Sequence, residues 1–122
     1  MGVEIVDAAI EDAKMNAKAN NLENTDFYCG AAETIVPKLI EKGERPDVVI
    51  IDPPRKGSDE KTLSSILTAA PERIVYVSCN PATLARDAKF LTGGGYKMVS
   101  ATPVDMFPNT EHVECCVLLC RT

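Results

Sequence analysis

Long apolar runs and aromatic residues are both scarce in this 122-residue sequence. It contains no Trp, three Tyr and three Phe. No apolar stretch approaches the roughly 18 residues that a membrane-spanning helix needs, and the start of the chain lacks the pattern of a secretory signal peptide. We therefore expect no association with membranes. The length predicts one domain with enough residues for one core.

Positive charge is also in short supply. Lys and Arg number 13 against 18 Asp and Glu, which gives a formal net charge of −5. Proteins that bind nucleic acids by themselves usually carry basic patches, because contacts with phosphates supply much of their affinity. This composition disfavours a free-standing nucleic-acid binder. If RNA is the partner, we expect its main contacts to come from outside these residues.

The cysteines lack the spacing of a metal site. The five residues, Cys29, Cys79, Cys115, Cys116 and Cys120, form no CxxC pair, so we predict no metal centre. An odd count without a secretion signal favours reduced thiols and a cytoplasmic location.

What the sequence does contain is an alternation of short apolar strands with helical stretches, which is typical of βαβ units and a parallel sheet. Strands are predicted at 3–6, 25–29, 47–52, 73–78, 96–105 and 113–121. Helices are predicted at 7–20, at 32–42, at 63–70, and from Pro81 to the glycines 93–95. The continuous apolar run at 47–52 predicts a central strand covered on both faces. The last two strands are expected to form an antiparallel pair at the end of the sheet.

This pattern matches an α/β, Rossmann-like sheet that begins in its middle. Such a fold opens with a strand and a glycine-rich turn that lets a nucleotide approach the backbone, and neither is present. The first strand already carries Glu4, an acid that belongs at the end of the second strand, where it commonly accepts hydrogen bonds from a ribose. A carboxylate that simply faces solvent is the alternative for Glu4. The glycines 93–95 follow a helix and precede a strand, so we interpret them as a helix stop.

The stretch IDPPRKG, residues 51 to 57, offers a first candidate site, because ligands of open α/β sheets bind at the carboxyl ends of the strands. Asp52 ends a buried strand, and two prolines stiffen the exit. A carboxylate there can hold a planar amide or a ring nitrogen. Similar loops with an aromatic fourth residue occur in enzymes that methylate amino nitrogens. Here that residue is Arg55, which offers forked donors to carbonyl oxygens.

Cys79 lies where a buried strand ends and a helix begins, within VYVSCNPATLARD. One interpretation is a small apolar residue that packs well. The other is a nucleophile, because the positive end of the helix dipole lies close to the sulfur and favours the thiolate. The sequence around this residue leaves both open.

The stretch DMFPNTEHVECC, residues 105 to 116, contains the only histidine, His112, between Glu111 and Glu114. A lone histidine is usually structural, and Glu111 is expected to face solvent. Glu114 opens the last strand and could point back across the strand ends. The cysteines that follow read as packed strand residues.

Together, DPPRKG, SCNPATLARD and DMFPNTEHVE closely resemble the RNA 5-methyluridine methyltransferases that modify tRNA and ribosomal RNA. The resemblance implies a class I methyltransferase fold and the cofactor S-adenosylmethionine. It implies that the Cys79 thiolate adds to C6 of uracil and that Glu114 is the base that removes the C5 proton. Arg55 would then bind the flipped-out uracil, and Asp52 would stand between cofactor and base. Two cofactor-binding positions, Glu4 and Ala31, complete the implied site.

The departures from the family are as informative. Its RNA-binding β-barrel, its central insertion and the iron–sulfur cluster of some members have no counterpart here, and a cluster would belong to the missing N-terminal part. The first strand, glycine-rich loop and first helix of the fold are missing as well. Residues 1–122 therefore read as the C-terminal part of a catalytic domain, which would bind tRNA or rRNA through the full-length enzyme. Alone, the chain is expected to be inactive.

Three alternatives stay open at this point. An RNA cytosine-C5 methyltransferase also uses a cysteine after this strand, but usually has a second cysteine after the aspartate-proline loop. A base-nitrogen methyltransferase would leave Cys79 idle. The third alternative is an inactive remnant or partner domain that binds no cofactor.

Overall fold

The computed structural model describes residues 1–122 and divides into two compact units, residues 1–43 and residues 44–122. Each unit is described by itself. The assignment of 1–122 to a single catalytic domain stays a prediction.

The first unit is built from two short parallel strands and two helices. Its elements in order are β1 (Gly2–Glu4), α1 (Asp7–Ala19), β2 (Phe27–Cys29) and α2 (Ala32–Glu41). β1 and β2 pair in parallel, with Glu4 opposite Cys29. α1 buries Ile10 and Ala17, which lie seven positions apart on one face. The observed bounds confirm the predicted order of elements and shorten both strands.

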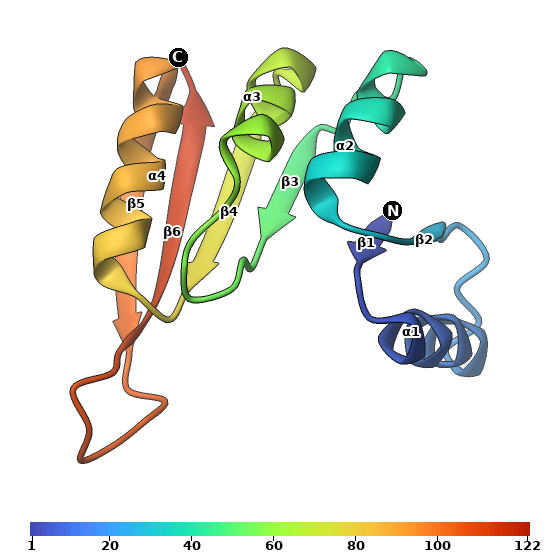
Figure 1. Ribbon diagram of the computed structural model, residues 1–122, viewed down its shortest axis with the longest axis horizontal. Helices are drawn as coiled ribbons and strands as arrows, with labels where there is room; N and C mark the ends of the chain where they lie inside the picture. The colour runs from blue at the N-terminus through green and yellow to red at the C-terminus, as the bar shows by residue number, and fades with distance from the viewer. The chain divides into compact units, whose positions relative to one another are not determined.

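The second unit contains a four-stranded sheet. Its elements in order are β3 (Val48–Ile51), α3 (Glu60–Ala69), β4 (Arg73–Ser78), α4 (Pro81–Gly93), β5 (Tyr96–Val104) and β6 (Glu114–Arg121). The strand order is β3-β4-β6-β5, with β3 and β4 parallel and the other neighbours antiparallel (Figure 1). β5 and β6 form the antiparallel pair at the end of the sheet, as predicted.

Local signals in the sequence define the helix ends of this unit. The Asn80 side chain accepts a hydrogen bond from the Ala82 amide at 3.0 Å, and Pro81 occupies the first turn of α4, as expected for an N-cap. α4 ends at Gly93, which confirms the glycines as a helix stop. α3 begins three residues before the prediction, because Asp59 caps it by accepting from the Lys61 amide at 2.8 Å.

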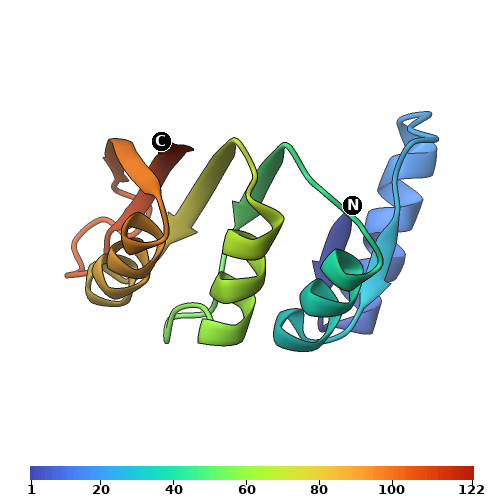
Figure 2. The same ribbon diagram turned by 90° about the horizontal axis from the view of Figure 1, so that it is seen from above.

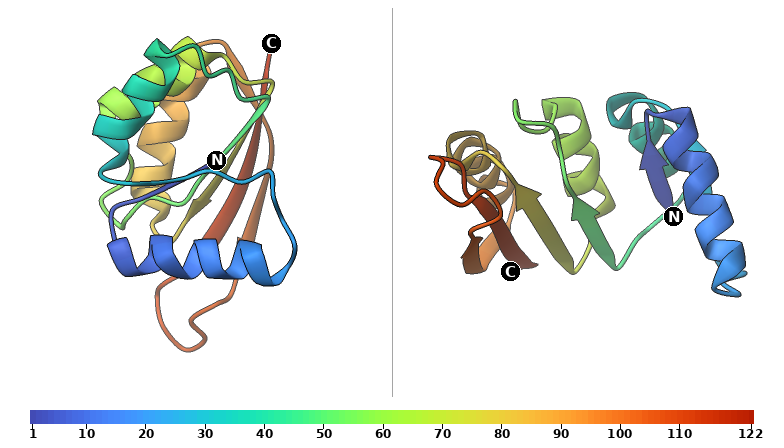
Figure 3. Two further views of the ribbon diagram at one scale, coloured as in Figure 1. Left: turned by 90° about the vertical axis from the view of Figure 1, so that its right-hand side faces the viewer. Right: turned by 90° about the horizontal axis from the view of Figure 1, so that it is seen from below.

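Both helices of the second unit cover the same face of its sheet, which Figures 2 and 3 show from three sides. The core lies between them and the strands. Its fully buried members include Ile74, Tyr76, Leu91 and Leu119. The Tyr96 hydroxyl donates to the carbonyl of Pro71 at 2.6 Å, so the aromatic ring is buried with its polar end satisfied.

One prediction about this sheet is wrong. β3 was expected to be a central strand covered on both faces, but it pairs only with β4 and is the edge strand of its sheet. Val48 and Ile50 are 39% and 71% exposed. The reason is that both helices of the unit lie on the other face. The apolar side chains on this face of β3 are typical of a strand that other elements cover, and no helix of residues 44–122 covers them.

No helix in the structure combines the length and the apolar character that crossing a membrane requires.

Candidate active site

Two candidate residues of the second unit meet where β4 and β6 adjoin. The antiparallel register pairs Ser78 with Cys115. Cys79 is the residue directly after β4, and Glu114 is the first residue of β6, so each adjoins one member of this last pair. The β4–β6 pairing thus brings the segments that carry the predicted nucleophile and the predicted base side by side, although they lie far apart in the sequence.

Arg55 reaches the same edge of the sheet from the loop after β3. Its Nη2 lies 3.0 Å from Nε2 of His112 and also contacts Nδ1 of that ring. His112, which the sequence suggested to be structural, therefore joins the loop of Arg55 to the loop before Glu114.

The loop that carries His112 is held by short-range contacts. The Thr110 hydroxyl donates to the Phe107 carbonyl at 2.7 Å and accepts from the His112 amide at 3.2 Å. The rings of Phe107 and His112 lie edge to face, with centroids 6.4 Å apart. Asn109 adopts a positive φ of 65° to close the turn. These contacts help to hold the His112 ring in the orientation in which it contacts Arg55.

Asp52 follows directly after β3 and is exposed, as is Arg55. The backbone between them and α3 is tied to the start of α4. The side-chain Nδ2 of Asn80 donates to the Arg55 carbonyl at 3.1 Å, and the Thr83 hydroxyl donates to the same oxygen at 3.2 Å. Asn80 adjoins Cys79, so these bonds connect the loop of Arg55 with the turn of the candidate nucleophile.

Sequence reasoning missed one buried polar group beside this loop, Asp87, which is 1% exposed. Its carboxylate accepts from the Tyr76 hydroxyl at 2.5 Å and from the Ser58 amide at 2.7 Å. Burial, and then the hydrogen bond to Asp87, raise the pKa of Tyr76 well above its ordinary value. An aspartate in the middle of a helix ordinarily indicates a face exposed to solvent. The neighbouring Arg86 is the one sequence signal that could have indicated a buried, paired Asp87.

The remaining two predicted residues, Glu4 and Ala31, lie in the first unit at neighbouring strand ends. Glu4 pairs with Cys29 in the sheet, and its carbonyl accepts from the Gly30 amide at 2.9 Å. Ala31 follows Gly30 and directly precedes α2. The structure thus brings Glu4 and Ala31 together in one unit, and Asp52, Arg55, Cys79 and Glu114 together in the other.

The Glu4 carboxylate has room for a further donor. Its Oε1 accepts from the Val6 amide at 2.9 Å, while the other oxygen has no partner. The next residue, Ile5, is 67% exposed, so an apolar surface lies next to a carboxylate oxygen that can still accept. Sequence reasoning missed Ile5, because alternation along such a short strand does not show which side chain is left uncovered.

Cys29 differs from Cys79 in its surroundings. Desolvation, followed by the negative charge of Asp7, raises the pKa of the Cys29 thiol above its ordinary value. A thiol that holds its proton is a poor nucleophile.

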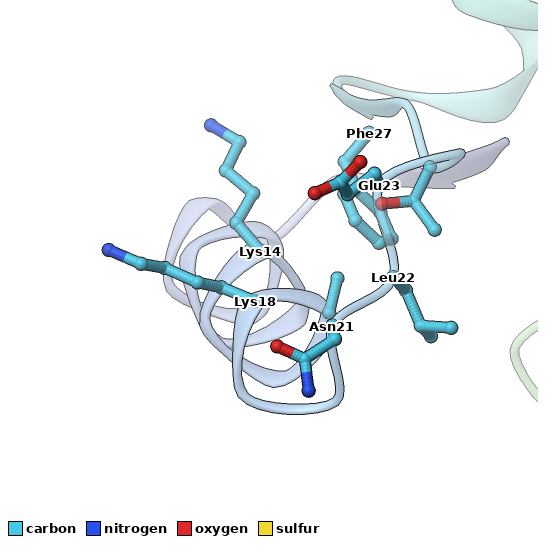
Figure 4. A pocket seen from close by; sticks show the side chains of 8 residues that line it. Lys14, Lys18, Asn21, Leu22, Glu23 and Phe27 are labelled. Carbon is cyan, nitrogen blue, oxygen red and sulfur yellow. The ribbon is translucent and has the colours of Figure 1, made fainter.

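Two cavities of the structure are lined by residues other than the six predicted site residues. One of about 340 Å³ lies between α1 and the segment leading into β2, where the Lys14 and Lys18 side chains point away from Glu23 and Phe27 (Figure 4). Lys14 pairs instead with Glu11 at 2.7 Å. A second, of about 510 Å³, lies between residues 56–60 and the α3 and α4 helices.

Comparison with solved structures defines the class of fold. The chain superimposes on the Pyrococcus abyssi tRNA (uracil-54, C5)-methyltransferase in complex with S-adenosyl-L-homocysteine with a TM-score of 0.78 and 35% identity, over 97% of this chain and 28% of that one. An rRNA methylase from Streptococcus thermophilus matches with a TM-score of 0.69 at 12% identity, over 98% of this chain and 70% of that chain, which shows the fold alone. The architecture is that of part of a class I methyltransferase.

The family is narrower than the fold. The model of the tRNA (uracil-5-)-methyltransferase family matches residues 1–122, so the chain belongs to that family. An uncharacterized RNA methyltransferase of Bacillus cereus is 58% identical over 98% of the chain, and one of Enterococcus faecalis is 53% identical over 98%. In both, the match covers 26% of the relative. The chain thus spans about a quarter of the length of these relatives.

Proposed function

We propose that this chain carries the catalytic residues of an enzyme that methylates C5 of uridine in RNA, with S-adenosylmethionine as cofactor. The observation that carries the proposal is the β4–β6 pairing, whose last pair, Ser78 and Cys115, adjoins Cys79 on one strand and Glu114 on the other, with the Arg55 loop tied to the turn of Cys79. A nucleophile, a base and a cationic hydrogen-bond donor are the three groups that this chemistry requires. The complete activity belongs to a protein of the length of the relatives.

Cys79 would act first. Uracil C5 is a weak nucleophile, and addition of the Cys79 thiolate to C6 turns the ring into an enolate whose electron density lies at C5. S-adenosylmethionine supplies the methyl group, which C5 takes as the sulfonium departs as the thioether S-adenosylhomocysteine. Cys79 is a free, half-buried thiol immediately before the N-cap of α4.

Glu114 would act second, as a general base. After methyl transfer, C5 carries both a proton and the methyl group. Removal of the proton by the Glu114 carboxylate lets the electron pair reform the C5–C6 double bond and expel the Cys79 sulfur. The β4–β6 pairing supports this role, because it brings the start of β6, where Glu114 lies, next to the end of β4, which Cys79 follows.

Arg55 would bind the uracil. Its guanidinium offers several donors in one plane, which suits the carbonyl oxygens of a flipped-out base. The contact with His112 uses one nitrogen of the fork and leaves the others for the ligand. Asp52, exposed at the end of β3, would lie between the base and the cofactor.

The first unit fits the nucleoside end of the cofactor. The free oxygen of the Glu4 carboxylate can accept from a ribose hydroxyl, and the exposed Ile5 offers an apolar surface for an adenine ring. Ala31 would line the same side from the neighbouring strand end. The role of these residues is to bind and orient.

A chimera tests this proposal. The matching segment of the Bacillus cereus relative, 58% identical, would be replaced by this chain, and the purified chimera would be incubated with S-adenosylmethionine and unmodified tRNA or rRNA. We expect 5-methyluridine in the digested RNA, and no product after Cys79→Ala. Production of 5-methylcytidine or of an N-methylated base would overturn the assignment in favour of the corresponding alternative.

The identity of the modified RNA follows from the same assay. The structural relative from Pyrococcus abyssi is named for uracil 54 of tRNA, and we propose tRNA as the first substrate to test, with rRNA as the second. Because the mechanism depends on a reduced thiol, we propose a cytoplasmic location.

A further inference from the structure

One face of α4 lies along the loop that joins β3 to α3. Asn80, Thr83 and Arg86 are spaced three residues apart, so their side chains share a side of the helix. Asn80 and Thr83 both donate to the Arg55 carbonyl. Arg86 continues the row, since its Nη2 donates to the carbonyls of Lys56 at 3.1 Å and Ser58 at 3.3 Å. Three loop carbonyls are therefore held by side chains of one helix.

Asp87 completes this arrangement from the buried side. Its Oδ1 lies 2.7 Å from Nη2 and 2.8 Å from Nε of Arg86, a two-point ion pair. Its Oδ2 accepts from the Ser58 amide and from the Tyr76 hydroxyl. Loss of the carboxylate would leave a buried hydroxyl and a loop amide unpaired, which is costly in a core. The carboxylate thus connects loop, helix and β4.

The loop backbone packs directly against this ion pair at Gly57. A Cβ on Gly57 would lie 2.4 Å from Nη2 of Arg86 and 2.7 Å from Oδ2 of Asp87. Gly57 also has a φ of 85°, which favours glycine. The position of the loop is therefore set by contact with Arg86 and Asp87 as well as by hydrogen bonds.

We propose that Arg86 and Asp87 are positioning residues for the uracil site, holding the Arg55 loop in place relative to the Cys79 turn from which α4 begins. The proposal rests on the proposed function, because it assigns a consequence to the placement of Arg55 against Cys79. Neither residue touches the reacting atoms. A displacement of about 1 Å in a group that positions substrate costs roughly 100-fold in rate, so loosening the loop should slow addition of Cys79 to uracil.

The first test compares two variants of α4 in the chimera. Arg86→Met and Lys89→Met each remove one positive charge from an exposed position of the helix, and only Arg86 contacts the loop. We expect Arg86→Met to slow formation of the covalent complex with 5-fluorouridine RNA by roughly 10-fold to 100-fold, with the KM for S-adenosylmethionine unchanged. Arg86→Lys should recover part of the rate. Equal rates for Arg86→Met and Lys89→Met would overturn the proposal.

The second test approaches the same contact from the loop. Gly57→Ala strains a positive φ and also collides with the ion pair, whereas Gly95→Ala strains a similar φ of 97° with no atom within 4 Å of the new Cβ. Complex formation should fall after Gly57→Ala and stay at the wild-type rate after Gly95→Ala. Equal losses in the two variants would mean that backbone strain alone explains the effect, and would contradict the proposal.

Amide exchange separates failure of this inference from failure of the proposed function. In the chain itself, Arg86→Met should accelerate hydrogen exchange at the Ser58 amide, and Lys89→Met should not. Unchanged exchange at Ser58 overturns the positioning role whatever the activity. A wild-type chimera that forms no 5-methyluridine overturns the proposed function, and with it the catalytic consequence drawn here.

Discussion

The two units of the chain differ in how firmly they hold their candidate residues. Residues 1–43 bury three apolar side chains, those of Ile10, Ala17 and Ile40. Residues 44–122 bury eleven, and nine of these form one cluster between the helices and the strands of the sheet. The residues proposed for covalent chemistry lie on the well-packed unit. The residues proposed for the cofactor lie on the other.

This difference indicates a division of tasks. Addition of a thiolate to a ring carbon requires the reacting groups to be held within a few tenths of an ångström, and a packed core with a tied loop supplies that. A two-stranded sheet is marginal alone, and it serves for a ribose contact whose geometry is less demanding. We therefore expect substitutions in the two units to have different kinetic and structural effects.

The largest expected contrast is between Cys79→Ala and Glu4→Ala in the chimera. Loss of Cys79 removes the nucleophile, so 5-methyluridine formation should fall to background at every cofactor concentration. Loss of Glu4 removes a charged hydrogen-bond acceptor, which should raise the KM for S-adenosylmethionine roughly 10-fold to 100-fold with a smaller change in kcat. Steady-state assays with varied cofactor distinguish the two. Loss of kcat alone after Glu4→Ala would contradict the division of tasks.

The next contrast concerns stability. Leu91 is fully buried in the second unit, and Leu91→Ala should lower the free energy of unfolding by about 2–5 kcal/mol. Ile10→Ala, at a 3% exposed position of the first unit, should reduce protection there and leave the amides of β4 and β6 protected. Residue-resolved hydrogen exchange measures both. Loss of β4 protection after Ile10→Ala would show that the units are not separate in stability.

A third prediction uses the raised pKa of Tyr76. Burial and the hydrogen bond to Asp87 favour the protonated Tyr76 hydroxyl in the folded state. The contribution of this hydroxyl to the stability of the folded chain is therefore complete below the unfolded pKa of about 10, and it is lost as pH rises through the higher folded pKa. Between these values the unfolded chain alone has lost the proton, so the free energy of unfolding should fall by up to about 1.4 kcal/mol per pH unit. Tyr76→Phe should remove that part of the slope. Denaturant titrations at several alkaline pH values check this, and identical slopes in the two proteins would contradict it.

The smallest effect is expected at the N-cap of α3. Asp59→Ala removes the acceptor for the Lys61 amide and should cost about 1 kcal/mol. Asp59→Asn retains a capping oxygen and should cost less. Amide hydrogen exchange should accelerate in α3 and stay unchanged in residues 1–43. A larger loss than that of Leu91→Ala would mean that the cap, rather than the core, limits stability.

Much of the fold could be predicted from local sequence. The strand at 73–78 has the predicted bounds, because an apolar run lies between a proline turn and a capping asparagine. The exposed face of β3 could not be predicted, since exposure depends on which elements pack above the sheet. The bounds of α3 were missed at Asp59, a cap with no apolar residue to mark it.

The candidate site likewise has features that local sequence predicts and features that depend on the fold. Most candidate residues could be chosen from their places at or after predicted strand ends, and Ala31 from the family resemblance. The proximity of the Cys79 and Glu114 segments depends on the β4–β6 pairing, which sequence alone leaves undefined. The contact of Arg55 with His112 joins positions 57 residues apart. Asp87 could not be recognised as buried, because only the fold brings Tyr76 and Ser58 to it. Contacts between residues far apart in the sequence could not be predicted from local sequence patterns.

The most direct measurement is covalent trapping of the chimera with RNA that contains 5-fluorouridine. Fluorine replaces the proton that Glu114 is proposed to remove, so the complex cannot resolve after methyl transfer. Digestion and mass spectrometry should find the methylated nucleotide on the peptide that contains Cys79, and no complex after Cys79→Ala. Attachment to any other cysteine, or undiminished 5-methyluridine formation by the Cys79→Ala chimera, would contradict the account.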